Sequence, residues 1–151
     1  MGKMTLQTFA GYAGRELGVS SWVVIGQERI DEFAQCTGDR QWIHVEPERA
    51  RSGPFAATVA HGYLVLSLLA PTSQEVWWGE LGAKAAVNYG LDRVRFIAPV
   101  RSGSRVRNRI RLVSVEPRGE DTMLVTTENT IEIEGEAKPA LIAVALSLLS
   151  N

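Results

Sequence analysis

The sequence predicts a single domain of the α+β class, in which one curved antiparallel sheet buries a long apolar helix. Three observations lead to this prediction. The segment Gly62–Ala70 is apolar at almost every position. Two later segments, Arg105–Leu112 and Met123–Glu134, alternate apolar and polar side chains, as strands with one solvated face do. The helical patterns come first in the chain, and consecutive strands joined by short turns form antiparallel sheets.

The composition is that of an ordinary globular domain. The chain has 151 residues, 45% of them hydrophobic and 22% charged, and we expect residues 1–151 to form one domain. The formal net charge of -1 argues against a nucleic-acid-binding protein, and Cys36, the one cysteine, excludes an internal disulfide. Met1–Ala10 lacks the apolar run of a signal peptide, and no apolar stretch is long enough to span a bilayer. We therefore expect a cytoplasmic protein that binds neither membranes nor nucleic acid.

The first helix is expected over Gly26–Cys36. Ile30, Phe33 and Ala34 recur there at helical spacing, with charged residues between them. The glycine that follows, Gly38, is a common helix terminator. The pattern predicts a short amphipathic helix that ends just before a loop.

Two further helical segments follow. Pro47–Arg51 predicts a helical turn, because proline at an early helical position loses no hydrogen bond. Gly62–Ala70 is apolar on every side, rich in leucine and β-branched only at Val65, so we interpret it as a helix buried all round. Pro71 is expected to end that helix.

Two other apolar features receive structural interpretations. Cys36 lies on the first expected helix and is interpreted as a small buried residue, not a nucleophile. Trp77-Trp78 follows the apolar helix, where it could form a hydrophobic cap over the core or a surface for a partner. We favour the cap.

The second half of the chain predicts four strands. Arginines alternate with apolar residues and Asn108 in Arg105–Leu112, and Met123–Glu134 alternates in the same way. The polar segment Pro117–Asp121 supplies the turn between these two. Leu91–Ile97 and Ala140–Leu149 are expected to be further strands of the same sheet.

Charge is distributed unevenly over these strands. Arg93–Arg111 holds seven arginines and no acid, whereas Glu116–Glu136 holds seven acids and one arginine. One interpretation is pairing of opposite charges across neighbouring strands. The other is that some arginines face a polyanionic ligand, for which the guanidinium is well suited. The sequence leaves both open.

The segment Phe33–His44 concentrates the residues that could perform chemistry. Asp39 and His44 are five positions apart, and on a continuous helix they would point in different directions. Because Gly38 breaks the helix, a loop can turn both side chains toward one point. A carboxylate and an imidazole around one water molecule form a competent acid–base pair. The spacing also fits a turn-forming aspartate and a structural histidine, which are the commoner roles.

Several stretches resemble, in the same order, the motifs of the MaoC-like family. They are the hydratase motif at Phe33, Gly38, Asp39 and His44, the His-Gly entry into the central helix at Ala60–Leu64, and the Asn-Tyr-Gly and Arg-Phe-x-x-Pro-Val stretches at Asn88–Gly90 and Arg93–Val100. The chain departs from the family at Gln41-Trp42, where many members have Asn-Pro. This departure affects the shape of the loop and the length of the acyl pocket.

The resemblance implies a hot-dog fold and the activity of an (R)-specific enoyl-CoA hydratase. Such an enzyme reversibly adds water to trans-2-enoyl thioesters of coenzyme A or an acyl carrier protein, giving (R)-3-hydroxyacyl thioesters. Asp39 and His44 would be its catalytic pair. Backbone N–H groups at Gly62, the expected start of the central helix, would stabilise the negative charge that develops on the thioester oxygen.

The remaining expectations concern binding. Asn88 either supports the active-site loop or shapes a turn. Arg93 and Arg95, or neighbours on their strand, are expected to hold the carrier phosphates, because arginine donates paired hydrogen bonds to phosphate. The family resemblance implies a homodimer. No cofactor and no metal are expected, since two histidines and one cysteine show no clustered ligand spacing.

Other functions of the same fold remain as alternatives. They are an acyl-CoA thioesterase, a non-catalytic acyl-binding hot-dog subunit and a plain binding module for hydrophobic ligands. Thioesterases and fatty-acid-synthesis dehydratases of this fold often carry an acid on the central helix, and Gly62–Ala70 contains none. A non-catalytic subunit is expected to lack Asp39 or His44, and both are present. We therefore favour the hydratase.

Overall fold

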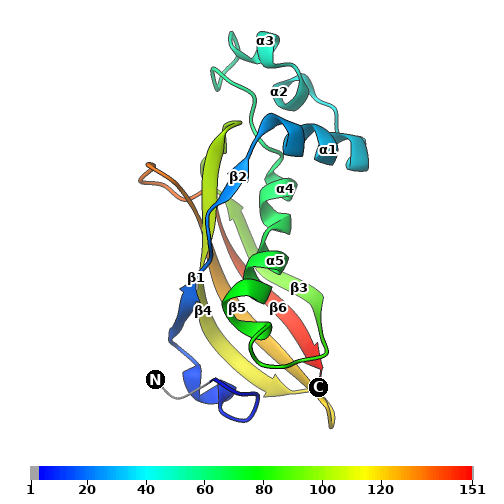
Figure 1. Ribbon diagram of the computed structural model, residues 1–151, viewed down its shortest axis with the longest axis vertical. Helices are drawn as coiled ribbons and strands as arrows, with labels where there is room; N and C mark the ends of the chain where they lie inside the picture. The colour runs from blue at the N-terminus through cyan, green and yellow to red at the C-terminus, as the bar shows by residue number, and fades with distance from the viewer. Residues whose placement is uncertain (1–3, 151) are drawn as a thin grey trace.

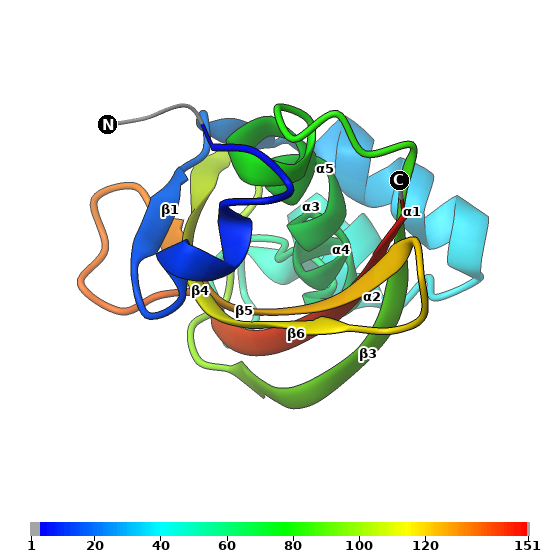
Figure 2. The ribbon, with the colours of Figure 1, turned by 90° about the horizontal axis from the view of Figure 1, so that it is seen from below.

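The computed structural model describes residues 4–150, so residues 1–3 and 151 of the expected domain lie outside the described residues. One curved antiparallel sheet wraps around a helical segment, and short helices gather beyond one end of that segment (Figure 1, Figure 2). The α+β class expected from the sequence is therefore confirmed. The helical elements are η1 (Phe9–Tyr12), α1 (Gln27–Thr37), α2 (Trp42–Val45), α3 (Pro47–Ala50), α4 (Gly62–Ser67), α5 (Leu69–Ser73) and the π-helical turn η2 (Gln74–Trp78).

The sheet has six strands, and all of its pairings are antiparallel. Its order is β1-β4-β5-β6-β3, and β2 pairs with β4 beyond the end of β1. The longest pairings join β4 to β5, β5 to β6 and β6 to β3, which leaves β3 as one edge of the sheet. The strands are β1 (Glu16–Val19), β2 (Val23–Ile25), β3 (Ala85–Phe96), β4 (Ser104–Pro117), β5 (Thr122–Ile133) and β6 (Leu141–Ser150).

The alternation in β4 and β5 is confirmed. Val106, Ile110 and Leu112 of β4 are fully buried, and the arginines between them point to the outer face. The expected turn joins these strands, and the Arg118 N–H donates to the Thr122 carbonyl across it.

Helix α1 follows the predicted pattern closely. It ends at Thr37, and Gly38 adopts a left-handed conformation with φ 84° that glycine tolerates best. Its buried residues are Ile30 and Ala34. The expectation that Cys36 is buried is wrong: it is exposed, because it lies on the side of the helix opposite Ala34.

The expectation that Pro71 ends the central helix is also wrong. Helix α4 is interrupted at Leu68, but the chain continues as α5 and η2 to Trp78. Pro71 lies in the first turn of α5, where the missing N–H is tolerated, so proline interrupts the regular pattern of hydrogen bonds without stopping the helix.

Nor is the central segment buried all round. Leu64 and Val65 pack in the core, but Tyr63 is 72% exposed, and Ser67 and Ala70 are exposed too. These exposed positions face an open groove of about 360 Å³ between α4, α5 and the edge strand β3. The sheet covers one side of the segment only, which sequence periodicity could not reveal.

Two apolar clusters fill the interior. The larger joins α1 and α4 to the sheet and lies beneath the short helices. The smaller lies at the far end, where Trp77 is 1% exposed and stacks on Phe9 at 5.3 Å between ring centroids. The interpretation of the tryptophan pair as a cap is thus confirmed for Trp77.

Within residues 4–150, no helix combines the length and hydropathy that crossing a membrane requires. The cytoplasmic location expected from the sequence stays a prediction.

Candidate active site

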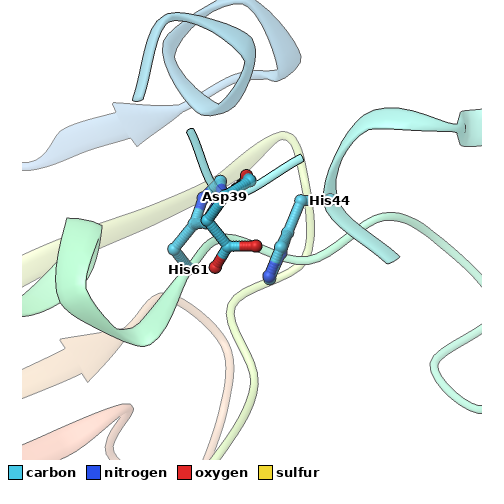
Figure 3. A group of neighbouring side chains, drawn as sticks. All are labelled: Asp39, His44 and His61. Atoms are coloured by element: carbon cyan, nitrogen blue, oxygen red, sulfur yellow. Dashed lines mark hydrogen bonds between the residues drawn. The ribbon is translucent and has the colours of Figure 1, made fainter. Parts of the chain in front are cut away.

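The site lies where α1 and α2 meet the first residue of α4, at one end of the sheet (Figure 1). Gly38 turns the chain sharply, so Asp39 points back toward α4 instead of continuing along α1. The short helix α2 then returns His44 to the same point. One carboxylate oxygen of Asp39 and one ring nitrogen each of His44 and His61 lie within 4.8 Å of one another (Figure 3).

His44 is held from two directions and is 6% exposed. Its Nδ1 lies 2.6 Å from the main-chain oxygen of Val59, and because a carbonyl only accepts, Nδ1 carries the proton. In the neutral form of the ring, the lone pair therefore lies on Nε2. Gln27 fixes the backbone: its amide donates to the His44 carbonyl at 2.7 Å and accepts from the Thr58 hydroxyl at 2.5 Å.

Asp39 is half-buried, and Gln41 holds its carboxylate. The Gln41 N–H and side-chain amide both donate to Asp39 Oδ1, at 3.4 and 3.2 Å. Burial alone would raise the pKa of Asp39, but these hydrogen bonds and the positive charge that His61 and His44 can carry hold the pKa below its usual value. The carboxylate is thus ionised at neutral pH, with Oδ2 left to bind another donor.

Trp42 explains how the loop keeps its shape without the Asn-Pro of many family members. The Arg49 guanidinium lies over its indole ring at 4.5 Å from the centroid. Its ring edge lies 3.0 Å from where a side chain on Gly53 would begin, so a larger residue there would press on the Trp42 ring. Packing of Trp42 therefore ties α2 to the segment after α3.

His61 is the member of this group that sequence reasoning missed. It is 3% exposed, and its Nε2 lies 2.9 Å from the main-chain oxygen of Asp39. Its ring stacks on that of His44, with 3.8 Å between centroids and 22° between planes. The sequence does contain one signal that could have pointed to His61. It directly precedes Gly62, the expected start of the helix that faces the substrate.

An open pocket of about 430 Å³ surrounds these side chains and has mostly apolar walls. Gly62 starts α4 in this pocket; the Leu64 N–H donates to the His61 carbonyl at 3.1 Å, whereas the N–H groups of Gly62 and Tyr63 have no partner within residues 4–150. The Phe96 ring lies 2.9 Å from where a side chain on Gly62 would begin, so a larger residue would clash. The pocket is lined by Phe33, Thr37, Asp39, His44, His61, Gly62, Tyr63 and Phe96.

Two histidines and a carboxylate are also a common metal-ligand set, but their geometry here argues against one. A metal ion bonds to imidazole nitrogen in the plane of the ring. The rings of His44 and His61 are stacked and nearly parallel, so a single ion cannot lie in both planes. The arrangement fits proton chemistry better than metal binding.

The arginines of β4 are paired with acids, which confirms the cross-strand interpretation for this strand. Arg107 and Arg111 lie directly opposite Glu132 and Glu128 of β5, Arg105 pairs with Glu134 just beyond β5, and Arg109 reaches both Glu132 and β1. The pairs are Arg105–Glu134, Arg107–Glu132 at 2.7 Å, Arg109–Glu132 at 2.8 Å, Arg109–Glu16 at 3.0 Å and Arg111–Glu128 at 3.7 Å.

The structure does not bring the other predicted site residues to this pocket. Asn88 lies inside β3 and lines the groove beside α4, so it does not shape a turn. Val94 packs against the core, and neighbours on a strand alternate, so Arg93 and Arg95 point to the outer face of β3. Neither arginine forms an ion pair with any residue between 4 and 150.

Comparison with known proteins gives consistent results. The sequence profile of the MaoC like domain matches residues 8–134. The chain is 52% identical over 134 residues to 3-hydroxyacyl-thioester dehydratase Z of Mycobacterium tuberculosis, covering 89% of this chain and 88% of that protein. It is 45% identical over 144 residues to nodulation protein N of Rhizobium leguminosarum bv. viciae, covering 95% and 89%.

Solved structures share the fold. The (R)-hydratase from A. caviae involved in PHA biosynthesis aligns with a TM-score of 0.72 over 89% of this chain and 94% of that one. Sequence identity in this alignment is 20%, so the likeness bears on the hot-dog architecture alone.

Proposed function

Because this chain belongs to the MaoC-like family, we propose that it is a hydro-lyase acting on acyl thioesters. The reaction is the reversible addition of water to a trans-2-enoyl thioester, giving an (R)-3-hydroxyacyl thioester. The single observation that carries this proposal is the convergence of the Asp39 carboxylate and the His44 imidazole on one apolar pocket. A dehydratase that is 52% identical over most of both chains supports the same reaction.

The two side chains suit a single water molecule. One carboxylate oxygen of Asp39 and one ring nitrogen of His44 lie within 4.8 Å of each other, a separation that one water with hydrogen bonds of about 2.8 Å can bridge. Ionised Asp39 and the unprotonated Nε2 of His44 both accept, so the water donates its two protons to them. Its oxygen lone pair is then free to attack the β-carbon of the substrate.

Proton balance follows from this arrangement. The water oxygen forms the bond to the β-carbon, one water proton passes to the Asp39–His44 pair, and the pair returns a proton to the α-carbon. Delivery from one face gives syn addition. The pair titrates as a unit, so the roles of base and acid belong to both residues together.

Gly62 completes the proposed site. Hydration places negative charge on the thioester oxygen as the enolate forms, and the N–H groups of Gly62 and Tyr63 are available to donate to it. The absence of a side chain on Gly62 lets the Phe96 ring pack against the start of the helix and form part of the pocket wall.

The alternatives explain the site less well. A thioesterase of this fold would be expected to use an acid on the central helix. The acid within residues 62–78 is Glu75, which accepts hydrogen bonds from the N–H and hydroxyl of Ser21, at 2.7 and 2.5 Å. A non-catalytic subunit would have no use for a carboxylate held against a buried imidazole at the wall of an apolar pocket.

The substrate carrier is coenzyme A or an acyl carrier protein. Arg93 and Arg95 remain our proposal for phosphate contacts, since they are the unpaired arginines of an exposed edge strand. Both side chains lie on the outer face of β3, on the side of the strand away from the core. Asn88 remains a proposed substrate contact in the groove beside α4.

We also propose a homodimer. Tyr63, Tyr89 and Leu91 are 72%, 56% and 45% exposed and line one groove beside the edge strand β3. A second copy would cover both the apolar side chains and the unpaired strand edge. Light scattering should give about twice 16.5 kDa at micromolar concentration. A stable particle of 16.5 kDa would contradict the dimer.

The activity is tested by the ultraviolet absorbance of the enoyl thioester during incubation with crotonyl-CoA and longer homologues. We expect the absorbance to fall as the conjugated double bond is hydrated, and the product to be the (R)-alcohol. Release of free thiol with the double bond intact would instead identify a thioesterase.

A further inference from the structure

His61 is buried in the site without a role in the proton transfer described above. It is the N-cap residue of α4 and precedes Gly62. Its Nδ1 is fully buried and has no hydrogen-bond partner within residues 4–150. A phenyl ring would fill the same space without burying an unpaired nitrogen, so packing alone does not account for an imidazole here.

The first contact of His61 is with the backbone of Asp39. Its Nε2 lies 2.9 Å from the Asp39 main-chain oxygen, and because that oxygen only accepts, Nε2 donates. This bond crosses from the start of α4 to the loop after α1. It fixes the residue whose carboxylate binds the water, at the point where Gly38 lets the chain turn.

The second contact of His61 is with the ring of His44. The two imidazoles stack at 3.8 Å, and Phe33 packs against His61 at 4.9 Å between centroids. Val59 restrains His44 at its Nδ1, while His61 restrains it across the face of the ring. The His44 ring can therefore neither rotate nor tilt without moving His61.

We propose that His61 is a positioning residue that sets the separation between the Asp39 carboxylate and the His44 imidazole. A single rigid ring is bonded to the backbone of one and stacked on the side chain of the other. This proposal rests on the proposed function. A misplacement of about 1 Å in such a pair can cost ~10²-fold in rate, so a rigid link between the two residues has a large effect on turnover.

Two substitutions separate the two contacts. His61→Phe keeps a ring that can stack on His44 but removes the donor to Asp39. His61→Gln keeps a donor but removes the ring. With crotonyl-CoA, we expect each variant to lower kcat by about tenfold or more and to change KM by less than about threefold, because the defect lies in the reacting geometry and not in substrate binding.

A double variant shows whether His61 acts through Asp39. Asp39→Asn removes the carboxylate that His61 positions, so adding His61→Phe to it should cause no further loss of kcat. The matched control is Phe9→Leu, which removes a stacked aromatic partner from Trp77 at the far end of the sheet. It should lower the melting temperature and leave kcat unchanged.

The outcomes are distinct. Wild-type kcat in both His61 variants would overturn the positioning role. It would also be overturned if His61→Phe lowered kcat by the same factor in the Asp39→Asn variant as in the wild-type protein. If His61→Phe does not fold, the same comparison is made with His61→Gln, measured as a single variant and combined with Asp39→Asn. A wild-type protein that does not hydrate crotonyl-CoA or its longer homologues would instead contradict the proposed function.

Discussion

The molecule contains two clusters of polar side chains in or beside the apolar core, and the difference between them distinguishes a structural role from a chemical one. One is the site formed by Asp39, His44 and His61. The other lies on the inner face of the sheet, where Asn108 of β4 is hydrogen-bonded to Asn129, its diagonal neighbour on β5, and both are 0% exposed. Both clusters place hydrogen-bonding groups beside apolar neighbours, where an unpaired group is costly.

The sheet cluster satisfies its donors internally. The Asn108 amide donates to Asn129 Oδ1 and to the Thr72 hydroxyl, both at 2.9 Å. The Asn129 amide donates to the Thr127 hydroxyl at 3.0 Å. These bonds join the central helix to β4 and β5 and fix the register between the two strands. Neither asparagine lines the pocket around Asp39.

The sheet cluster has one acceptor without a partner among residues 4–150, Asn108 Oδ1, and it is buried; the free acceptors of the site cluster lie beside an open pocket instead. Asp39 Oδ2 and the Nε2 of His44 keep lone pairs beside an open pocket, while every other contact of these residues serves to orient them. Buried polar groups paired among themselves stabilise a fold, whereas groups held rigidly with unused acceptors are available for a substrate. The two clusters should therefore respond to substitution in opposite ways.

The largest expected effect is the fall in kcat when Asp39 or His44 of the site cluster is replaced. Asp39→Asn and His44→Gln should each lower kcat with crotonyl-CoA by about 10²-fold or more, the usual scale for loss of general acid–base catalysis. Melting temperatures should stay close to that of the wild type, since neither change empties the core. Loss of folding in both variants would make this cluster structural, like that of the sheet.

The opposite response is expected in the sheet cluster. Asn108→Leu leaves the Asn129 and Thr72 acceptors without a donor and should lower the free energy of unfolding by about 1–3 kcal/mol. Urea denaturation measures this loss, and kcat per folded molecule should be unchanged. A large fall in kcat for Asn108→Leu with an unchanged free energy of unfolding would show that the sheet cluster has a chemical role, against the comparison between the clusters.

A smaller effect on activity is expected at Arg93 and Arg95, which form no ion pair within residues 4–150. Arg93→Glu or Arg95→Glu should raise KM for crotonyl-CoA by up to about tenfold, equivalent to ~1.4 kcal/mol, with kcat little changed. The penalty should shrink at high salt. Arg111→Gln is the matched control, because Arg111 already pairs with Glu128. If both β3 variants keep the wild-type KM, these arginines do not bind the carrier.

The smallest expected effect is a shift in pH dependence. Gln41→Met removes a hydrogen bond that lowers the pKa of Asp39, so that pKa should rise and the acid limb of kcat/KM should move to higher pH. A lowered carboxyl pKa stabilises the fold above the unfolded value and loses that effect as pH falls through the folded value. The variant should therefore be slightly less stable at neutral pH but not in strong acid. Gln35→Met, on the exposed side of α1, is the control. If the acid limb of kcat/KM lies at the same pH in both variants, Gln41 does not lower the pKa of Asp39.

Features with a local signal were predictable from the sequence. The alternation in β4 and β5 marked their buried faces, including Asn108 and Asn129, and Gly38 marked the turn that brings Asp39 back toward His44. Each of these depends on a few neighbouring residues whose geometry follows from backbone chemistry.

Features set by distant parts of the chain were not predictable. The short strands β1 and β2 lack a clear alternation and form by pairing with β4. Whether Tyr63 is buried depends on which strand covers α4, and the role of His61 depends on the loop around Asp39 folding against it. Periodicity carries no information on either.

The central claim is that Asp39 and His44 act as one unit on one water molecule. The most direct test is kcat of the double variant Asp39→Asn/His44→Gln with crotonyl-CoA, measured beside both single variants. We predict that the double variant is little slower than either single variant, because removing one member already disables the pair. A double variant slower by the product of the two single losses, about 10⁴-fold in total, would show two independent contributions and contradict the account.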